Sequence, residues 1–323
     1  MIPAARRFLL RHPSLLAVVV AIYGEKYRRK YGCRLRLGSD GRHFALRKGR
    51  KELRLSIPHS AYIEDAAQRL DYYLDAIVPE LIGGKEVGDF SVPRLHRIRG
   101  ITEQFLFTSF PEGVDTANAY FDVFNIKPGD VVIDAGAYCG LTAYLFSKAV
   151  GPTGTVVAIE ADPQNYEALR GNLNRHRTPN IIPIHAAVWR ENGVVEFASE
   201  GNMGSAVLEV SPAKPHKVSV PSVTLSDVCA QLKLTRVDHV KMDIEGAEYE
   251  AIPASREFIE SYHPDFLIEM HLDKDGTINV EKLRHFFSDL RYDMRVTPQP
   301  GDEIFPLLHF APRPEDRQAP QFD

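Results

Sequence analysis

The sequence predicts an α/β protein with a doubly wound, mostly parallel sheet, preceded by an N-terminal α+β accessory region. From about residue 115 onward, short apolar strands alternate with helical segments, and such alternation is typical of a parallel sheet that helices cover on both faces. The 323 residues are 44% hydrophobic and 25% charged, an ordinary globular balance that excludes disordered and collagen-like classes. We therefore expect an accessory region over residues 1–115 and a main domain over residues 116–323.

The accessory region begins with an apolar run, Leu15 to Tyr23 (LLAVVVAIY), that follows two arginines. The run is shorter than the roughly 20 residues that span a bilayer, and no small-residue cleavage site follows it. It predicts a packed or interfacial helix and no transmembrane segment, and peripheral membrane contact stays open. The formal net charge of −4 conceals basic stretches in this region (RKYGCRLRLG, RKGRKELR), which suit either an anionic partner or a solvated basic face.

Three further elements are expected in the accessory region. Residues 33–57 alternate apolar and polar side chains around two turn sequences, as in a small antiparallel meander. Residues 62–81 have a helical pattern that ends at Gly83 and Gly84. The segment 105–113 (FLFTSFPEG) predicts a strand followed by a turn.

The cysteines indicate the redox environment. Cys33, Cys139 and Cys229 lie far apart and form neither a zinc-binding nor a disulfide pattern. A reducing, cytoplasmic location is therefore expected.

In the main domain, the predicted elements follow one another with short connections. Strands are expected at residues 131–136, 154–161, 180–188, 193–199, 237–244 and 264–271, and helices at 116–126, 141–150, 163–176, 224–232 and 248–259. The segment 292–312 predicts two more strands around a Pro-Gly turn, as an antiparallel edge. Because ligands of an open parallel sheet bind beyond the carboxyl ends of its strands, the residues at those ends are the candidates for function.

The first strand end carries VVIDAGAYCG, in which Asp134 precedes Gly136 and Gly140. The glycines allow a tight turn and a close approach of the backbone to a ligand at the start of the next helix. The GxxxG spacing differs from the GxGxxG of nicotinamide-binding proteins, and the preceding acid suits a ligand with an ammonium group better than a pyrophosphate. An ordinary strand-to-helix turn is the alternative.

The next two strand ends predict contacts with a nucleoside. Glu160, twenty positions after Gly140, offers two oxygens to the two hydroxyls of a ribose. Ala186 and Ala187 would leave space for a flat adenine, although alanines also pack in ordinary strands. Together with Asp134, Glu160 favours S-adenosylmethionine, which has both an amino acid and a ribose.

Seven segments in this order carry a resemblance to a known family: VVIDAGAYCG, GTVVAIEADPQNYEALRGNL, AAVWRENGVVEF, GNMGSA, VPSVTLSDV, VKMDIEGAEYEAI and DFLIEMH. With them, residues 128–272 resemble the FkbM family of S-adenosylmethionine-dependent methyltransferases. Three positions depart from the family pattern: Tyr138 stands where Asn is usual, Ala161 where Pro is usual, and Ser226 where Asp is common.

The resemblance implies a Rossmann-like class I methyltransferase fold, a seven-stranded sheet whose seventh strand is antiparallel. It implies methyl transfer to a hydroxyl of a sugar, a polyketide, or another secondary metabolite or glycan. No basic, aromatic-interleaved stretch indicates a nucleic-acid acceptor. The cofactor-binding residues expected are Asp134, Gly136, Tyr138, Gly140, Glu160, Ala161, Ala187 and Asp243.

Two alternatives stay open at this point. One is a module that binds the cofactor without catalysis, because Tyr138 departs from the family pattern. The other is a nicotinamide-dependent oxidoreductase, although the phosphate-binding glycines that it would need are absent from the sequence.

Four side chains at later strand ends are candidates for the base that accepts the hydroxyl proton. They are Asp243 and Glu245 in KMDIEGAE, and Glu269 and His271 in FLIEMH, with His185 a weaker candidate. Histidine has a suitable unperturbed pKa, and burial would raise the pKa of Glu269, for which Lys241 could serve as an ion-pair partner. 

A divalent metal is a further alternative. Asp243, Glu245 and Glu269 have the chemistry that Mg²⁺ prefers, but their spacing does not by itself predict a site, and no metal is predicted. Within KMDIEGAE, the core is expected to end at Met242. Gly246 is expected in a turn and Glu248 in the first turn of the next helix, where a negative charge is favoured.

The segment GNMGSA, residues 201–206, has glycines at two positions that would give a loop flexible ends. It fits either a mobile loop over the site or a simple connection.

Overall fold

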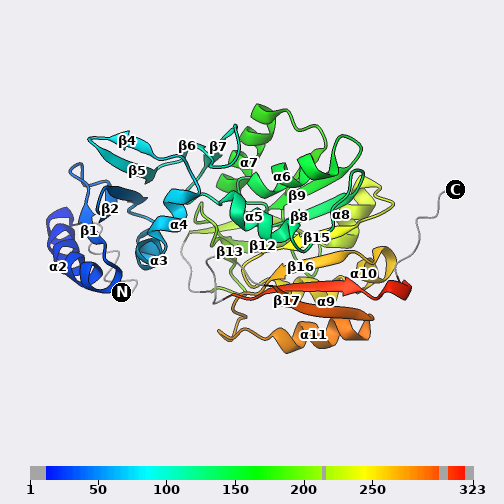
Figure 1. The fold of residues 1–323 in the computed structure, drawn as a ribbon. Coiled ribbons are helices and arrows are strands. Elements are labelled where there is room, and N and C mark those ends of the chain that lie inside the picture. Colours follow the sequence, from blue (N-terminus) through cyan, green and yellow to red (C-terminus); the bar gives the residue numbers. More distant parts are fainter. Residues whose placement is uncertain (1–11, 213–215, 298–304, 317–323) are drawn as a thin grey trace. The chain divides into compact units, whose positions relative to one another are not determined.

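The computed structural model describes residues 12–212, 216–297 and 305–316 (Figure 1). The chain forms two compact units, residues 1–114 and 115–323. No helix within the described ranges is both long and apolar enough to cross a membrane.

The first unit is built on a five-stranded sheet with the order β1-β2-β3-β5-β4. Neighbours β1 to β3 pair antiparallel, which confirms the predicted meander, whereas β5 runs parallel to β3. A hairpin of β6 and β7 forms a separate two-stranded sheet. The elements are α2 (Pro13–Tyr31), β1 (Arg34–Leu37), β2 (His43–Lys48), β3 (Lys51–Ser56), β4 (Glu80–Ile82), β5 (Lys85–Phe90), β6 (Arg94–Arg97) and β7 (Gln104–Phe107).

The predicted helix at residues 62–81 is wrong in its second half. Helical structure covers Ser60–Tyr62, then α3 (Ile63–Gln68) and α4 (Leu70–Asp75), and the chain then enters β4. Gly83 and Gly84 both have positive φ, 56° and 74°, and they turn β4 into β5 instead of ending a helix. Two left-handed residues between strands are the signature of a tight hairpin, which competes with the helix-stop interpretation.

Much of the basic stretch in β2 and β3 is neutralised within the first unit. The buried carboxylate of Glu52 pairs with Arg47 at 2.6 Å, Arg54 at 2.9 Å and Lys85 at 3.3 Å. Asp71 pairs with two further lysines of the same hairpin, at 2.7 Å each. These strands therefore carry fewer uncompensated charges than the sequence indicates.

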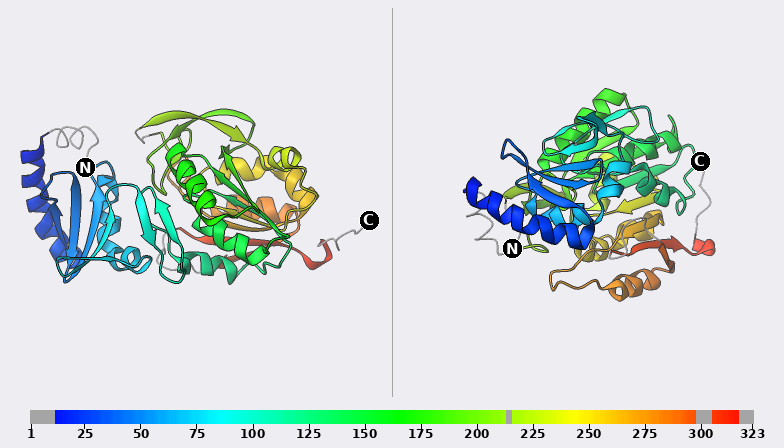
Figure 2. Two further views of the ribbon diagram at one scale, coloured as in Figure 1. Left: turned by 90° about the horizontal axis from the view of Figure 1, so that it is seen from above. Right: turned by 60° about the vertical axis from the view of Figure 1, so that its left-hand side comes forward.

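The second unit contains the predicted mostly parallel sheet, which has seven strands in the order β10-β9-β8-β15-β16-β18-β17 (Figures 1 and 2). The first five strands pair in parallel, and β18 is antiparallel to both of its neighbours. This order and this antiparallel strand confirm the doubly wound class I methyltransferase fold. The strands are β8 (Val131–Ala135), β9 (Thr155–Glu160), β10 (Ile181–His185), β15 (His239–Met242), β16 (Asp265–Glu269), β17 (Tyr292–Thr297) and β18 (Leu307–Pro312).

Helices pack on both faces of this sheet, as alternating strand–helix order requires. On one face, residues of α5, α6 and α7 form a core with Val132, Val156 and Leu267. On the other, residues of α8 to α11 pack with Ile133, Val157 and other inward side chains. The helices are α5 (Val114–Phe121), α6 (Leu141–Val150), α7 (Pro163–His176), α8 (Leu225–Leu232), α9 (Glu248–Ala254), α10 (Arg256–Tyr262) and α11 (Val280–Asp289).

Two predicted elements of the main domain are each divided in the structure. The expected strand at 180–188 becomes β10 and β11 (Ala187–Val188), which belongs to a small sheet with β14, β12 and β13. The expected helix at 248–259 breaks at Ser255, whose hydroxyl donates to Ala251 O at 2.7 Å and competes with the helix ladder. The small sheet comprises β11, β12 (Gly193–Ala198), β13 (Ala206–Val207) and β14 (Lys217–Val223).

The two edge strands expected at 292–312 are present as β17 and β18, and they are antiparallel to each other. The Pro-Gly turn expected between them lies outside the described residues.

Candidate functional site

Four parallel strands deliver carboxylates to one edge of the seven-stranded sheet. Asp134 lies at the end of β8 and Glu160 at the end of β9, while Asp243 follows β15 and Glu269 ends β16. Because these strands pair in parallel, their carboxyl ends meet at the same edge. The sequence-predicted site residues are thereby brought to one region of the fold.

The loop after β8 passes so close to β15 that only glycine fits at its start. Gly136 has φ 80°, and a Cβ there would lie 1.8 Å from the carbonyl oxygen of Asp243. Gly140 has φ 85°, and a Cβ there would lie 2.3 Å from a methyl carbon of Leu169. Both glycines therefore form the expected tight turn, and the close approach seen at each is to another part of the chain.

Tyr138 occupies the position in this loop where the family usually has Asn. Its φ is 49°, in the left-handed region that asparagine adopts more readily than tyrosine. Its ring is buried, and its backbone N–H donates to Glu160 Oε2 at 2.8 Å. The departure from the family pattern therefore leaves the backbone link between the glycine loop and Glu160 in place.

Glu160 is buried at the end of β9, with each carboxylate oxygen accepting one backbone N–H. Oε1 accepts from Asp162 and Oε2 from Tyr138, both at 2.8 Å. Burial raises the pKa of Glu160 to about 8, against the lowering effect of these two hydrogen bonds. The Asn165 side chain also hydrogen-bonds to this carboxylate and lowers its pKa. The carboxyl group lies at the strand end where the sequence predicts contact with the hydroxyls of a ribose, and the glycine loop lies beside it.

Asp134 is fully buried and faces the buried ammonium group of Lys241. The Lys241 Nζ lies 3.4 Å from Asp134 Oδ1 and donates to Gly136 O at 2.9 Å. Burial raises the pKa of Asp134 despite the opposing charge of Lys241. Neither Asp134 oxygen accepts a hydrogen bond from the described part of the chain, so its carboxylate supports the glycine loop through Lys241 and is not itself open to solvent.

Ala186 and Ala187, the alanines expected beside adenine, lie between β10 and β11 and at the start of β11, and Ala161, expected to bind the cofactor, follows β9. The carbonyl oxygen of Ala161 is 3.2 Å from His185 Nε2, and Ala186 and Ala187 are both buried. The imidazole of His185 also stacks on Tyr166, with ring centroids 4.7 Å apart. These contacts hold the His185 imidazole against α7 and the backbone that follows β9.

Asp162 is a site-adjacent residue that sequence reasoning missed. It caps the N-terminus of α7 by accepting from Gln164 N at 2.8 Å, and its other oxygen accepts from Gly201 N at 3.0 Å and Ser205 Oγ at 2.6 Å. Asn165 adds a bond from its side-chain amide to Asn202 O at 2.9 Å. The loop at 201–205 is thereby held beside the end of β9, and the Asp-Pro sequence at a helix start was the available signal for the cap.

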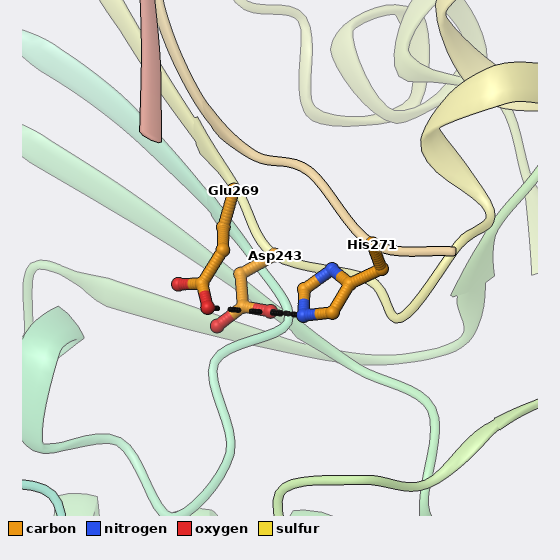
Figure 3. A group of neighbouring side chains, drawn as sticks. All are labelled: Asp243, Glu269 and His271. Atoms are coloured by element: carbon orange, nitrogen blue, oxygen red, sulfur yellow. Dashed lines mark ion pairs between the residues drawn. The ribbon is translucent and has the colours of Figure 1, made fainter. Parts of the chain in front are cut away.

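The three candidate carboxylates gather around the imidazole of the fourth candidate, His271, and Figure 3 shows two of them, Asp243 and Glu269. His271 Nε2 lies 3.7 Å from Asp243 Oδ1, 3.8 Å from Glu245 Oε1 and 3.8 Å from Glu269 Oε1. The side chain of His271 is 8% exposed and that of Glu269 is 11% exposed, whereas those of Asp243 and Glu245 are 24% and 26% exposed. A solvent-accessible acceptor would therefore meet Asp243 and Glu245 more readily than His271.

Glu248 holds the other side of His271. It lies in the first turn of α9, as expected, but its side chain is fully buried, which the sequence did not indicate. Glu248 Oε1 accepts from Ile244 N at 3.0 Å and lies 3.3 Å from His271 Nδ1. The imidazole is thus oriented with Nδ1 toward Glu248 and Nε2 toward the other carboxylates.

The surrounding carboxylates favour the charged form of His271. Burial acts against the charged imidazole, but Glu245, Glu248 and Asp243 outweigh it and raise the pKa of His271 well above its ordinary value. In the charged form the imidazole donates protons and has no lone pair to accept one.

Asp243, Glu269 and His271 also have a spacing that could hold a metal ion, with one ligand atom from each lying within 4.8 Å of the others. This set differs from the three carboxylates that the sequence indicates, because His271 takes the place of Glu245. An imidazole with two carboxylates suits a first-row transition metal better than Mg²⁺, which prefers oxygen ligands.

Comparison with known proteins identifies the second unit. Residues 134–294 match the model of the methyltransferase FkbM domain. The 31-O-demethyl-FK506 methyltransferase FkbM of Streptomyces tacrolimicus is 26% identical over 183 residues, 47% of this chain and 69% of that protein. Methyltransferase 1 of Beauveria bassiana is 24% identical over 152 residues, 41% of this chain and 61% of that protein.

Among solved structures, methyltransferase FkbM from Methylobacillus flagellatus is 17% identical with a TM-score of 0.46, covering 60% of this chain and 47% of that one. The chain thus spans about half of that structure and less than two thirds of the Beauveria bassiana relative. Residues 134–294 of this chain form a domain of the FkbM methyltransferase family.

Proposed function

We propose that this chain transfers a methyl group from S-adenosylmethionine to a hydroxyl oxygen of a sugar, polyketide, or other secondary metabolite or glycan. The observation that carries the proposal is that residues suited to a nucleoside cofactor and residues suited to proton transfer lie at the same edge of the sheet. A glycine loop and the carboxylate of Glu160 end β8 and β9, and a cluster of carboxylates follows β15 and β16. The first pair suits a nucleoside cofactor, and the second suits removal of a proton.

On the cofactor side, Glu160 and the loop from Gly136 to Gly140 would hold S-adenosylmethionine. When bound, the cofactor supplies an electrophilic methyl group on a sulfonium, which needs positioning more than activation. The described residues contribute the ribose-binding carboxylate and a backbone that approaches without side chains at Gly136 and Gly140. Asp162 contributes by fixing the loop at 201–205 against the same strand end.

On the acceptor side, we assign the hydroxyl proton to Glu269. Asp243 lies 3.6 Å from Lys241 Nζ and 3.7 Å from His271 Nε2, and Glu269 lies 3.8 Å from the same imidazole nitrogen. Glu269 is more buried, so taking up a proton removes a charge from surroundings that solvate it poorly. Glu269 would accept the hydroxyl proton, and the bound cofactor would supply the methyl group by losing its S–C bond and leaving as the neutral thioether.

The oxygen specificity rests on one relative and on this chemistry. The name of the Streptomyces tacrolimicus relative describes methylation of a 31-O-demethyl compound, and hence transfer to oxygen. A hydroxyl must lose its proton during transfer, which gives the carboxylates at the sheet edge a function.

Calorimetric titration with S-adenosylmethionine tests the cofactor half of the proposal. Glu160→Ala should weaken binding about 10- to 100-fold, since it removes the hydrogen-bond partner of the ribose hydroxyls and leaves them unpaired. Glu167→Ala is a matched control, because Glu167 lies on the adjoining α7 with a side chain 68% exposed, and its affinity should equal that of the wild type. Equal affinities for all three proteins would contradict the cofactor site.

Transfer of a labelled methyl group to a panel of saccharides and hydroxylated polyketides tests the catalytic half. Glu269→Gln should lower kcat about 100- to 10,000-fold while the affinity for the cofactor stays unchanged. Asp243→Asn should have the smaller effect on kcat. Tight cofactor binding with no transfer to any acceptor would favour a binding module without catalysis.

A further inference from the structure

Helix α2 is attached to the first unit through one narrow face. Leu16 and Val20 are 6% and 5% exposed, and one turn further on, a Cβ at Gly24 would lie 2.7 Å from the carbonyl oxygen of Leu35 in β1. These residues are spaced four apart, so they lie on the same side of the helix. The helix therefore packs on β1 by this side, and the opposite side is turned away from the unit.

The opposite side of α2 is apolar over its first half. Leu15, Val18 and Ile22 are 48%, 58% and 67% exposed. Spacings of three and four residues place them in one stripe along the helix. A surface helix normally presents polar side chains there, so this stripe indicates that another apolar phase covers it.

The same stripe becomes basic over the second half of the helix. Lys26 and Arg29 continue it at spacings of four and three, and both are exposed. Arg28 and Lys30 flank Arg29 in the last turn. Lys30 pairs with Glu64 at 2.7 Å, and the one acid of the helix, Glu25, is shared by Arg28 at 2.6 Å and Arg29 at 3.2 Å. Lys26 has no carboxylate within ion-pair distance among the residues described, so α2 carries an excess of positive charge beside its apolar stripe.

We propose that α2 binds the surface of an anionic lipid bilayer. Leu15, Val18 and Ile22 enter the boundary between headgroups and acyl chains, and Lys26 and Arg29 contact the lipid phosphates. The apolar and basic residues of the stripe lie on one side of α2, so a helix that lies in the plane of the interface turns all of them toward the bilayer. The basic second half keeps the helix at the interface and prevents it from spanning the bilayer.

Charge complementarity favours lipid over a second copy of the chain as the occupant. The basic residues of β2 and β3 are paired inside the first unit, whereas Lys26 and the shared pair Arg28 and Arg29 face outward on α2. A second copy brings the same positive stripe and no anionic counterpart on it. A bilayer that contains acidic phospholipid supplies both an apolar layer and a negative surface.

Flotation of the full chain with vesicles tests the proposal. The probes are phosphatidylcholine vesicles and phosphatidylcholine vesicles with about 30% phosphatidylglycerol, at low and high sodium chloride. The wild type should bind the anionic vesicles at least about tenfold more tightly than the neutral ones, and salt should weaken this binding. Val18→Ser with Ile22→Ser should lower binding to anionic vesicles at least about tenfold, because it removes the apolar contact.

Two further variants separate charge from apolar contact. Lys26→Glu should lower binding to anionic vesicles about fivefold or more, with little effect on neutral ones. Leu81→Ser is the matched control, because Leu81 is 76% exposed on β4 of the same unit, and its binding should equal that of the wild type.

Three results would overturn the proposal: equal binding of the wild type to both vesicles, unchanged binding after the Val18 and Ile22 substitutions, or equal losses in the Leu81 control. A wild-type dimer in light scattering that the Val18 and Ile22 substitutions abolish would assign the stripe to a second copy instead. Because all the substituted side chains are exposed, unchanged circular dichroism is expected to confirm that the variants fold.

Discussion

Replacing Lys241 by methionine tests the buried charge arrangement behind the glycine loop. Lys241 is 2% exposed and lies between Asp134, which is fully buried, and Asp243. Methionine has a similar length but no charge, so it leaves the Asp134 carboxylate buried without a cation. Breaking a buried ion pair by removing one partner costs about 3–5 kcal/mol of the free energy of unfolding.

The pH dependence of this loss follows from the pKa of Asp134. Burial raises that pKa above its usual 3.8 and Lys241 opposes the rise, so Lys241→Met should raise it further. When the pKa of an acid is higher in the folded than in the unfolded state, its ionisation lowers the free energy of unfolding. This loss is absent at pH values below the unfolded-state pKa, grows as pH rises above it, and levels off beyond the folded-state pKa. The variant should therefore lose more stability at about pH 8 than at about pH 4.

Urea denaturation followed by tryptophan fluorescence measures the free energy of unfolding of residues 115–323, the unit that contains Lys241. Trp189 is the single tryptophan of the chain and is buried within residues 115–323, so its signal reports unfolding of the methyltransferase unit. Lys148→Met serves as the control, because Lys148 is an exposed lysine on α6 and its replacement should cost no more than about 0.5 kcal/mol. A loss below about 1 kcal/mol for Lys241→Met, or an equal loss at both pH values, would refute the proposed role of Lys241.

Three other changes have defined outcomes. Gly136→Ala should lower the free energy of unfolding in urea by at least about 3 kcal/mol, because its Cβ would lie 1.8 Å from Asp243 O. Gly129→Ala is the control: its φ of 93° is similar, but the nearest atom to its Cβ would lie at 3.7 Å, so it should cost only about 1–2 kcal/mol. Glu248→Gln should lower the pKa of His271, which an NMR titration measures. Because the pKa of His271 is raised in the folded state, its charged form stabilises the fold, and this stabilisation is lost as pH rises through the folded pKa. The variant should therefore lose less stability as pH rises, and an unchanged pKa of His271 would contradict the role of Glu248. Dialysis against EDTA should leave methyl transfer unchanged, whereas activity that disappears and returns with Mn²⁺ would place a cation in the carboxylate–histidine cluster.

The sequence predicted best where a local signal and the tertiary structure agree. The helix at 163–176 has the predicted bounds because Pro163 and the Asp162 cap fix its start. The parallel sheet followed from alternating strands and helices, and strand polarity alone brought Asp134, Glu160, Asp243 and Glu269 to one edge.

The sequence predicted least where a tertiary contact decides the outcome. Residues around Leu81 have a helical pattern, but the hairpin at Gly83 and Gly84 converts them to a strand. The charge of His271 depends on Glu245, Glu248 and Asp243, which reach it from a loop and a helix start that no periodicity places beside it. The sequence suggested Glu269 as the partner of Lys241 and did not predict the pairing with Asp134, because that pairing follows from the register of β15 on β8.

The hydrogen bonds of Asp162 determine which residues of the loop at 201–205 can be substituted in an engineered enzyme without moving its backbone. Gly201 and Ser205 bond to the aspartate, Asn202 bonds to Asn165, and the N–H of Gly204 bonds to the Asn202 side chain. The Met203 side chain takes part in none of these bonds within the described part of the chain. Library design for new acceptors can therefore begin by varying Met203 alone, since every other position in the loop would alter the backbone that presents it.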